Sequence, residues 1–429
     1  MIEIVNTAGL SAEELLAKPK ASQPDVSAAV AAVLEKVKAE GDAAVLEYTR
    51  RFDGAELSAL RVTGQEIEEA LAEAGEEFLA VLQQAAANIR AFHIKQVRQG
   101  FVMAQQPGVV AGQKITPIAR VGIYVPGGTA AYPSTVLMDA IPAAIAGVGR
   151  IVMVTPPGKS GKIPAGVLAA AHVAGVTDIY KVGGAQAVAA LAFGTESIPR
   201  VDKIVGPGNL YVATAKRMVY GTVDIDMIAG PSDVLVVADE SANPVYVAAD
   251  MLAQAEHDEN AAAVLVTTNA ALAQQVQRQL ELQLPRLPRQ KIAAASLQNN
   301  GRILLASTLE KAIEIANAIA PEHLELCVQD PFAFLPLVQN AGSIFLGHNT
   351  PEALGDYFAG PNHTLPTGGT ARFSSPLSVD DFIKKSSYLY YSQQALQAAS
   401  AKVELFAKTE GLQAHANSVT LRTNPENAL

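Results

Sequence analysis

The stretch RIVMVTPPGKSGKIPAGVLAAAHVAGVTDIYKV, residues 150–182, decides the fold class. It begins with a short apolar run at 150–155, continues through a helix-like segment from Pro164, and ends in a second apolar run at 178–182. Short apolar runs that alternate with helical segments are typical of strand–helix–strand units in a parallel sheet. The stretch therefore predicts two parallel strands with a helix between them.

The same alternation continues in both directions along the chain. Apolar runs at 121–125 and 203–206 flank the first stretch, and further helix-like segments begin near Pro133, Gln186 and Asn209. A second series of apolar runs follows at 234–239, 262–268, 302–306, 323–328 and 343–347. We therefore predict an α/β protein with two Rossmann-like, doubly wound parallel-sheet domains.

The remaining segments have other patterns. Residues 26–99 have apolar positions three or four apart, which predicts helices, and the last fifty residues return to a helical pattern. Residues 355–376 are rich in Gly, Pro, Ser and Thr without a convincing period. Because a long irregular stretch in a compact protein usually serves function, we expect a functional loop there.

Composition excludes several classes of partner. The chain has 429 residues, enough for two or more domains, and its 32 basic against 42 acidic residues give a net charge of −10. This balance argues against nucleic acid or an anionic membrane as a partner. Every apolar run is interrupted before it could span a bilayer, and the N-terminus lacks the pattern of a secretory signal. We therefore expect a cytoplasmic protein without a membrane segment.

Three glycine-bearing turns follow predicted strands, at 124–134, 182–188 and 205–217. Open α/β sheets bind ligands beyond the carboxyl ends of their strands, where backbone amides at a helix start can approach a phosphate. None of the three turns fits the G-x-G-x-x-G pattern, since Tyr211 stands where the third glycine is expected. A tight turn needs the same glycines, so these turns alone are weak evidence for a dinucleotide.

Seven histidines limit any site that is built on imidazole. His257 follows Gln254 by three positions in a helical-looking segment, so one helix face would present both side chains. His323 directly follows Glu322; a histidine suits proton transfer near neutral pH, and a carboxylate beside it could activate water. Taken singly, either histidine is more often a packing or surface residue. The only cysteine, Cys327, excludes an intramolecular disulfide and leaves nitrogen and oxygen as the main metal donors.

Taken together, the motifs resemble the histidinol dehydrogenase family along nearly the whole chain. The stretches that carry the resemblance are IYVPGG, GPGN, AGPSDVLVVAD, AQAEHD, APEHLEL, GDYFAGPNHTLPTGGTARFSSPLSV and EGLQAHANSV. The resemblance implies a zinc-dependent enzyme that oxidises L-histidinol through L-histidinaldehyde to L-histidine with two NAD, in the last steps of histidine biosynthesis.

The resemblance also implies roles for individual residues. Glu322 and His323 would be the catalytic pair: His323 would take the alcohol proton, and Glu322 would activate the water that adds to the aldehyde. The implied zinc ligands are Gln254, His257, Asp356 and His415. The implied substrate contacts are Ser232, Gln254, His257, His323, Asp356, His363, Glu410 and His415, and the implied NAD contacts are Tyr124, Gln186 and Asn209. For Ser232 and Tyr124, a turn or packing role stays open.

The resemblance further implies a division of the chain. We expect an N-terminal helical arm at 1–23, a first Rossmann-like domain at 24–123 and 234–377 with the metal and catalytic residues, and a second at 124–233 that binds NAD. Residues 378–429 would form a helical dimerisation segment. The family is a homodimer, so Glu410 and His415 would complete the site of the other subunit.

Two alternatives stay open at this stage. One is a related zinc- and NAD-dependent dehydrogenase of another small polar alcohol, against which His363 and Glu410 argue because they are implied substrate contacts. The other is a nonenzymatic metabolite-binding protein on the same scaffold, against which the Glu322–His323 pair argues.

Overall fold

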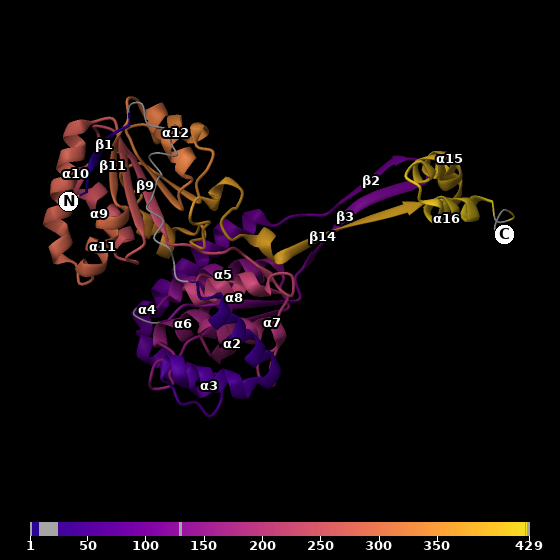
Figure 1. The fold of residues 1–429 in the computed structure, drawn as a ribbon, viewed down its shortest axis with the longest axis horizontal. Helices are drawn as coiled ribbons and strands as arrows, with labels where there is room; N and C mark the ends of the chain where they lie inside the picture. Colours follow the sequence, from indigo (N-terminus) through magenta and orange to yellow (C-terminus); the bar gives the residue numbers. More distant parts are fainter. Residues whose placement is uncertain (1, 8–24, 128–130, 425, 427–429) are drawn as a thin grey trace. The chain divides into compact units, whose positions relative to one another are not determined.

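The computed structural model describes residues 2–7, 25–127, 131–424 and 426. The chain forms two compact units. The first unit comprises Met1–Gln96 and Ile118–Phe382, and the second comprises Val97–Pro117 and Ile383–Leu429. The first unit contains two parallel sheets with helices on both faces (Figure 1), which confirms the predicted α/β class with two doubly wound sheets.

One sheet of the first unit has the strand order β6-β5-β4-β7-β8, and all its pairs are parallel. Its strands are β4 (Arg120–Tyr124), β5 (Arg150–Thr155), β6 (Asp178–Lys181), β7 (Lys203–Val205) and β8 (Asp224–Ile225). The connecting helices are α5 (Pro133–Ala146), α6 (Ala165–Ala174), α7 (Gly184–Phe193) and α8 (Leu210–Val219). The stretch 150–182 thus forms β5, α6 and β6, as its pattern predicts.

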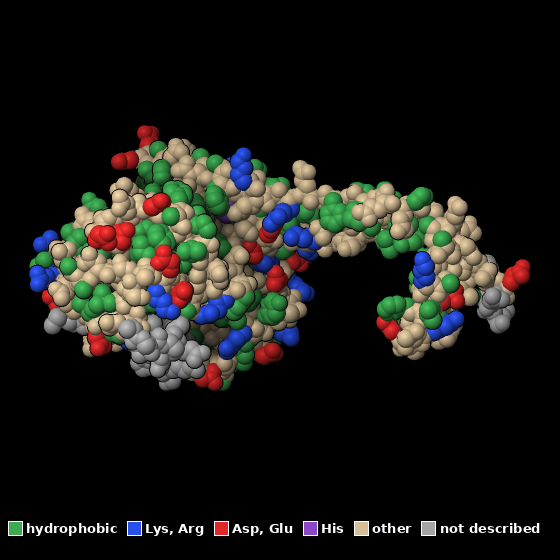
Figure 2. Space-filling model, turned by 90° about the horizontal axis from the view of Figure 1, so that it is seen from above, with side chains coloured by type: hydrophobic (Ala, Val, Ile, Leu, Met, Phe, Trp, Pro, Cys, Tyr) green, Lys and Arg blue, Asp and Glu red, His purple; other side chains and the backbone are tan. Residues whose placement is uncertain are grey.

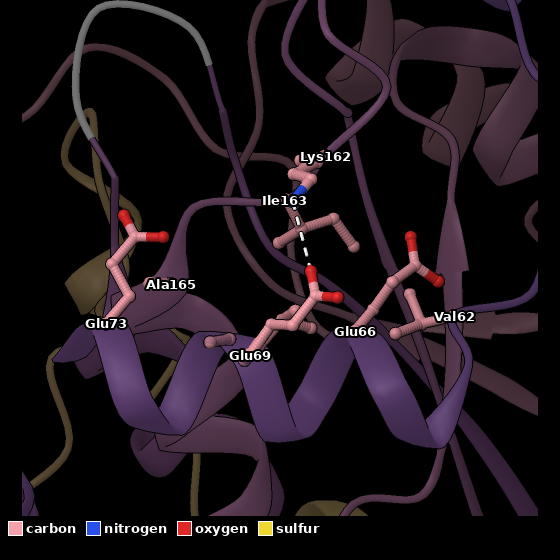
Figure 3. A pocket seen from close by; sticks show the side chains of 9 residues that line it. Val62, Glu66, Glu69, Glu73, Lys162, Ile163 and Ala165 are labelled. Atoms are coloured by element: carbon pink, nitrogen blue, oxygen red, sulfur yellow. Dashed lines mark hydrogen bonds and ion pairs between the residues drawn. The ribbon is translucent and has the colours of Figure 1, made fainter.

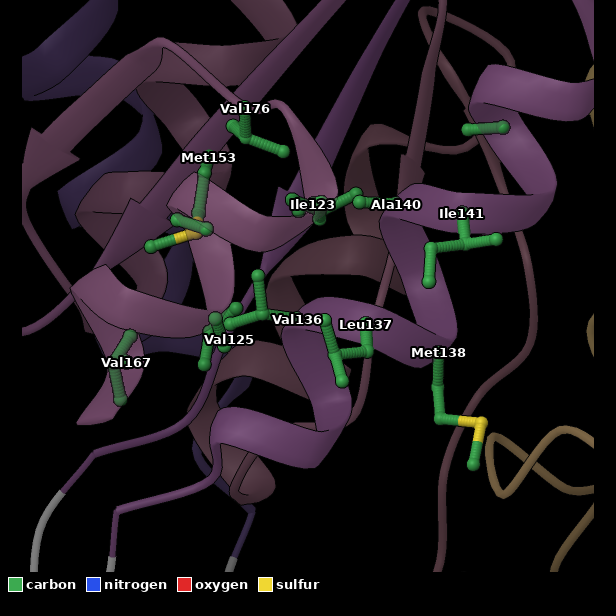
Figure 4. Close-up of a cluster of buried hydrophobic side chains, with 14 of the residues drawn as sticks. Ile123, Val125, Val136, Leu137, Met138, Ala140, Ile141, Met153, Val167 and Val176 are labelled. Carbon is green, nitrogen blue, oxygen red and sulfur yellow. The ribbon is translucent and has the colours of Figure 1, made fainter. Parts of the chain in front are cut away.

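Alternating side chains of this sheet enter two hydrophobic cores. Met153 on β5 packs with α4, α5 and α6 in the core of Figure 4, whereas its neighbours Val152 and Val154 pack with α2, α3, α7 and α8 on the opposite face. Small residues allow the helices to approach closely: a Cβ on Gly122 would lie 2.8 Å from the Leu191 side chain of α7. Burial on both faces explains why these strands are apolar throughout.

Three N-terminal helices cover this same sheet. They are α2 (Ser27–Glu40), α3 (Asp42–Asp53) and α4 (Gly64–His93), in agreement with the helical pattern of residues 26–99. The side chains of α2 and α3 join the core of α7 and α8, and those of α4 join the core of α5 and α6. The sequence analysis placed these helices in one domain with residues 234–377, which carry the expected metal ligands. That division into domains stays a prediction.

The other sheet of the first unit has the strand order β1-β11-β10-β9-β12-β13, again entirely parallel. Its strands are β1 (Ile4–Asn6), β9 (Asp233–Ala238), β10 (Ala262–Thr267), β11 (Arg302–Leu305), β12 (His323–Cys327) and β13 (Ser343–Leu346). Helices α9 (Pro244–Ala255), α10 (Ala270–Gln283) and α11 (Gln290–Asn300) cover one face, and α12 (Leu309–Ile319) covers the other (Figure 1).

The prediction of an N-terminal helical arm at 1–23 is wrong for residues 4–6, which form β1. This short run pairs with β11, some 300 residues later in the chain (Ile4 with Ile303), and a local pattern does not reveal such a partner. The rest of the predicted arm, residues 8–24, lies outside the described residues.

The second unit consists of an antiparallel sheet and two helices. Its sheet has the order β14-β3-β2, with β2 (Phe101–Gln106), β3 (Val109–Pro117) and β14 (Ile383–Tyr391), and α15 (Gln393–Thr409) and α16 (Gln413–Thr423) follow. The helical prediction for the last fifty residues is therefore right for α15 and α16 and wrong for 383–391. This segment is a strand because it pairs with β3, far away in the sequence.

Shorter elements complete the fold. They are α13 (Pro331–Phe334), α14 (Glu352–Leu354), a π-helix η4 (Gly355–Ala359), and the 3₁₀ turns η1 (Ile94–Gln96), η2 (Leu284–Arg286), η3 (Leu335–Leu337), η5 (Thr370–Arg372) and η6 (Val379–Phe382). Among the described residues, no helix has both the length and the apolar character that crossing a membrane requires. Acidic and basic side chains are interspersed over the face drawn in Figure 2.

Candidate active site

Glu322 and His323 lie at the amino end of β12. Helix α12 ends at Ala320, whose positive φ of 53° places it in the left-handed region, and the chain then turns through Pro321 into the strand. His323 pairs with Val234 of the neighbouring strand β9, so Ser232 and Asp233 lie beside the pair. Glu322 and His323 are buried, with 5% and 4% of their surface exposed.

Reciprocal hydrogen bonds hold Glu322 against the start of β9. The backbone N–H of Asp233 donates to Glu322 Oε2 (3.1 Å), and the backbone N–H of Glu322 donates to Asp233 Oδ1 (2.9 Å). The Ser232 hydroxyl also donates to the Glu322 carboxylate. Burial raises the pKa of Glu322 to about 7, although His323 opposes the shift. A carboxyl group with this pKa can take and return a proton near neutral pH.

The ring of His323 is oriented by the backbone of β9. Its Nδ1 lies 3.3 Å from the carbonyl oxygen of Asp233, and a hydrogen bond there requires a proton on Nδ1. In the neutral ring Nε2 is then the basic nitrogen, and Asp356 Oδ1 lies 3.5 Å from it. Burial alone would lower the pKa of His323, but the carboxylates of Glu352 and Glu322 raise it well above its ordinary value. The ring therefore favours its protonated form, in which Nε2 also carries a proton and faces Asp356.

Gln254 and His257 come from the carboxyl end of α9. Gln254 lies fully buried in the last turn, whereas His257 follows the end of the helix at Ala255 and is exposed. The backbone N–H of His257 donates to the Gln254 carbonyl oxygen (3.2 Å), so the turn continues beyond the helix. The two residues are therefore held together by a helix end, not by one regular helix face as the spacing suggested.

Asp356 lies on the π-helix η4, which directly follows α14 and its Glu352. One ligand atom each from His257, Glu352 and Asp356 lie within 4.8 Å of one another. Burial would raise the pKa of Asp356, but hydrogen bonding from His323 and the charge of that ring lower it. Imidazole nitrogen and carboxylate oxygens at this separation are donors that suit a zinc ion. The residues present therefore fit the implied metal.

His363 is held between Asp356 and helix α5. Its Nδ1 lies 2.9 Å from the Asp356 carbonyl oxygen, and its Nε2 lies 3.2 Å from the Thr135 hydroxyl. The neighbouring Thr364 donates to the buried carboxyl of Asp139 on α5 (2.9 Å). The loop predicted to be functional, 355–376, thus contributes Asp356 and His363 and is fixed by buried hydrogen bonds.

The expected NAD contacts lie at the carboxyl edge of the other sheet. Tyr124 ends β4, Gln186 lies in the first turn of α7, and Asn209 caps α8 by accepting from the backbone N–H of Tyr211 (3.0 Å). The Tyr124 hydroxyl accepts from the backbone N–H of Gly184 (3.0 Å). These residues therefore surround the starts of two helices, where backbone N–H groups favour an anion.

The loop before Asn209 is fixed by a buried ion pair. Lys216 pairs with Asp226, and both are almost fully buried. Lys216 Nζ donates to the Gly206 carbonyl oxygen (2.9 Å), while the Gly206 N–H donates to Asp226 Oδ2 (2.7 Å). Gly206 has a φ of 108°, and a Cβ there would lie 2.2 Å from the Tyr124 carbonyl oxygen. Only glycine fits this position.

Two of the expected site residues belong to the second unit. Glu410 follows the end of α15 and His415 lies in the first turn of α16, and both side chains are exposed. Within the first unit, the structure brings together Ser232, Gln254, His257, Glu322, His323, Asp356 and His363.

Sequence reasoning missed Glu352 and Asp233. Glu352 is 2% exposed, and burial raises its pKa to about 8. Its one sequence signal is its position four residues before Asp356, in a segment too short to display a helical period. Asp233 was overlooked because it contacts the Glu322 backbone and the His323 ring across two strands, which a motif does not show.

A separate small surface cavity lies along the first turns of α4 (Figure 3). Its polar lining comes from Glu66, Glu69, Glu73 and Lys162, and the Lys162 ammonium pairs with Glu69 (3.1 Å). None of the expected site residues lines it.

Comparison with known proteins agrees with this geometry. The family model described as histidinol dehydrogenase matches residues 16–423. The histidinol dehydrogenase of Clostridium acetobutylicum is 52% identical over 426 residues, which is 98% of this chain and 99% of the relative. That of Syntrophotalea carbinolica is 55% identical over 416 residues, 96% of each chain.

A solved structure agrees as well. The crystal structure of histidinol dehydrogenase from Elizabethkingia anophelis superposes with a TM-score of 0.95 at 41% sequence identity and covers 99% of each chain. The match extends over both compact units and so includes every residue of the site. The chain therefore belongs to the histidinol dehydrogenase family of oxidoreductases.

Proposed function

We propose that the chain oxidises L-histidinol through L-histidinaldehyde to L-histidine, with zinc and two molecules of NAD. The observation that carries the proposal is the buried Glu322–His323 pair, which faces the donor atoms of Gln254, His257 and Asp356. A base, a carboxyl group and a metal-binding set in one place suit two successive oxidations at the same carbon.

The proposed zinc ligands are Gln254, His257, Asp356 and His415. When bound, zinc would hold the imidazole and amine of the substrate, so that the alcohol carbon is positioned for oxidation. Gln254, His257 and Asp356 come from two segments that converge in the first unit, the end of α9 and the π-helix. His415 would come from the second unit of a partner chain.

In the first oxidation, His323 would act as the base. In the neutral ring, Nε2 would accept the alcohol proton, because the Asp233 carbonyl would hold the other proton of the ring on Nδ1. As the proton leaves, the alcohol carbon can release a hydride to NAD. The carboxylates around the ring stabilise the imidazolium that forms.

In the second oxidation, Glu322 would act on water. An aldehyde must first add water before its carbon can lose another hydride and become a carboxylic acid. The Glu322 carboxyl, which has a pKa of about 7, is suited to take a proton from that water. The Ser232 hydroxyl and the Asp233 N–H keep the carboxylate in place, and Ser232 would also contact the substrate together with His363.

For NAD, the proposal assigns Tyr124, Gln186 and Asn209 at the carboxyl edge of the β4–β8 sheet. The positive end of the α8 dipole and the fixed conformation of Gly206 before it support an anion-binding role for this edge. Gln186 is buried, and its Nε2 has no hydrogen-bond partner among the described residues, so a ligand could supply one.

We also propose a cytoplasmic homodimer in which the second unit reaches the site of the partner chain. The second unit exposes many large apolar side chains (Figure 2), among them Phe101, Val102, Leu389, Tyr390, Leu405 and Phe406, each at least 50% exposed. An apolar surface of this kind marks an interface. A second copy of the chain is the proposed partner, because Glu410 and His415 lie on the same unit as this surface.

The test is to supply purified protein with L-histidinol and excess NAD, and to measure NADH by absorbance and histidine by chromatography. A parallel sample is stripped with a chelator and then reloaded with zinc. We expect two NADH for each histidine, lost on stripping and restored by zinc. If folded, zinc-loaded protein forms no NADH from histidinol, the proposal is wrong and other small polar alcohols become the candidates.

A further inference from the structure

Glu352 and Gln254 face each other in the interior beside His323. With its nitrogen turned toward Glu352, the Gln254 amide lies 3.1 Å from both carboxylate oxygens and donates to them. The same nitrogen lies 3.3 Å from His323 Nδ1, whose proton is directed instead to the Asp233 carbonyl oxygen. The opposite orientation would set the amide oxygen against two carboxylate oxygens, and like partial charges repel each other. Gln254 is fully buried, so no solvent screens this interaction. Glu352 therefore determines which end of the amide points toward it.

We propose that Glu352 is a positioning residue that turns the oxygen of Gln254 toward the metal. The inference rests on the proposed zinc site. An amide binds a metal through its oxygen, because the lone pair of its nitrogen is delocalised into the carbonyl group. If the nitrogen is fixed on Glu352, the oxygen is directed away from that carboxylate and becomes available as a ligand. Partners that orient a metal ligand in this way usually affect metal affinity.

Glu352 is itself held in place. Its backbone N–H donates to Glu325 Oε1 (2.9 Å), and Glu325 is hydrogen-bonded to Asp250. Asp250 lies on α9, one helical turn before Gln254. Glu325 and Glu352 are 1% and 2% exposed. The backbone of Glu352 is thus fixed through Glu325 and Asp250 to the helix that carries Gln254.

Direct coordination by Glu352 is the competing explanation. One of its oxygens lies within 4.8 Å of ligand atoms of both His257 and Asp356. However, both of its oxygens are engaged by the Gln254 amide, and one also lies 4.0 Å from His323 Nδ1. The two roles differ in what a neutral replacement does. A glutamine at 352 can still accept a hydrogen bond from Gln254, but it cannot supply the charge of an anionic ligand.

The experiment measures zinc affinity, by competition with a chromophoric chelator, for the wild type, Glu352→Ala and Glu352→Gln. We expect a loss of roughly 10- to 100-fold for Glu352→Ala. Glu352→Gln should bind nearly as the wild type does, and cobalt substitution should leave its visible spectrum unchanged. In a Gln254→Ala background, Glu352→Ala should add little further loss, because its effect passes through that amide.

Asp239→Asn is the matched control. Asp239 is a buried, hydrogen-bonded carboxylate at the opposite end of β9, where it accepts from the Gln329 N–H (3.0 Å). The control should lose thermal stability without losing zinc affinity, which separates a general effect on folding from one on the site.

Three results would overturn the inference. They are unchanged affinity in Glu352→Ala, full additivity with Gln254→Ala, or an equally large loss in Glu352→Gln with shifted cobalt bands, which would make Glu352 a ligand. If Glu352→Ala does not fold, the Glu352→Gln and Gln254→Ala variants still decide between the two roles. A wild type that binds no zinc would overturn the proposed function itself, and this outcome is visible before any variant is made.

Discussion

The two parallel sheets of the first unit present their candidate residues at opposite ends of their strands. In the β4–β8 sheet, Tyr124 and Asn209 follow the carboxyl ends of strands, where helices begin. In the other sheet, Ser232 and His323 lie at the amino ends, where α9 ends with Gln254. A helix start carries partial positive charge and a helix end partial negative charge. The first edge therefore suits an anionic cofactor and the second a cation.

A substitution at the amino edge of the sheet that carries Glu322 and His323 should have the largest effect on activity. We expect Glu322→Gln to slow the conversion of L-histidinaldehyde by about 100-fold or more, because the amide cannot take a proton from water. Oxidation of L-histidinol should fall far less, since His323 keeps its own contact with Asp233. Single-turnover measurements that start from either compound separate the two steps. Equal losses in both steps would contradict the division of roles between Glu322 and His323.

A substitution at the carboxyl edge of the β4–β8 sheet should lower both the stability of the protein and its affinity for NAD. Lys216→Met leaves Asp226 buried without its ion-pair partner and releases the Gly206 carbonyl, so we expect unfolding to become easier by about 3–5 kcal/mol. NAD affinity should fall while zinc affinity does not change. Chemical denaturation and titration calorimetry measure these effects.

Lys162→Met is the matched control for that prediction. Its ion pair with Glu69 is exposed, so its removal should change stability by less than about 1 kcal/mol. A similar loss in both lysine variants, or a loss of zinc affinity in Lys216→Met, would argue against a separate role for the carboxyl edge.

The stability of the protein should depend on pH through Asp139, which connects α5 to Thr364. Asp139 on α5 is fully buried and accepts from Thr364, and burial raises its pKa from 3.8 to about 8. At pH values between 3.8 and about 8, Asp139 keeps its proton in the folded protein but releases it in the unfolded chain. Asp139 therefore makes the free energy of unfolding fall as pH rises, by up to about 1.4 kcal/mol per pH unit. Asp139→Asn removes this dependence.

Denaturation of both proteins between pH 5 and pH 8 tests the prediction. The stability of Asp139→Asn relative to the wild type should increase with pH and level off above about pH 8. A difference that stays constant over this range would show that the Asp139 carboxyl is already ionised in the folded protein at pH 5.

The smallest expected effect concerns the helix start at the carboxyl edge. Asn209→Ala removes the side chain that accepts from two N–H groups of α8, and we expect a loss of about 1 kcal/mol in stability. If Asn209 also contacts NAD, the KM for NAD should rise. Asn269→Ala removes the equivalent cap from α10 and is the control, because it should cost similar stability with no change in KM.

Periodicity and motif order predict much of this molecule. The strands of both sheets are continuous apolar runs because helices cover both faces, so each appears in the sequence as a short, separate signal. The expected catalytic pair and the expected metal ligands near the end of α9 were proposed because they lie in short stretches that resemble a family, and their roles stay predictions.

The features that were not predicted depend on pairing across the fold. Strand β14 was taken for helix because its partner β3 lies far away in the sequence. Glu352 gave only a weak signal, because its proposed role depends on Gln254, a residue on another element. The general rule for open sheets points to the carboxyl edge, although the strand predicted at 323–328 already placed His323 at its amino end.

The pairing of β14 with β3 also has a consequence for synthesis on the ribosome. Ile383 pairs with Pro117, so at ~5–20 residues per second the ribosome needs roughly 15 to 50 s to supply the partner of β3. Until then, β3 has an unpaired edge along its whole length, which includes the apolar residues Val109, Val110 and Ala111. An open edge of this kind invites pairing with other nascent chains. The edge of β3 therefore stays open to other nascent chains until β14 has been made.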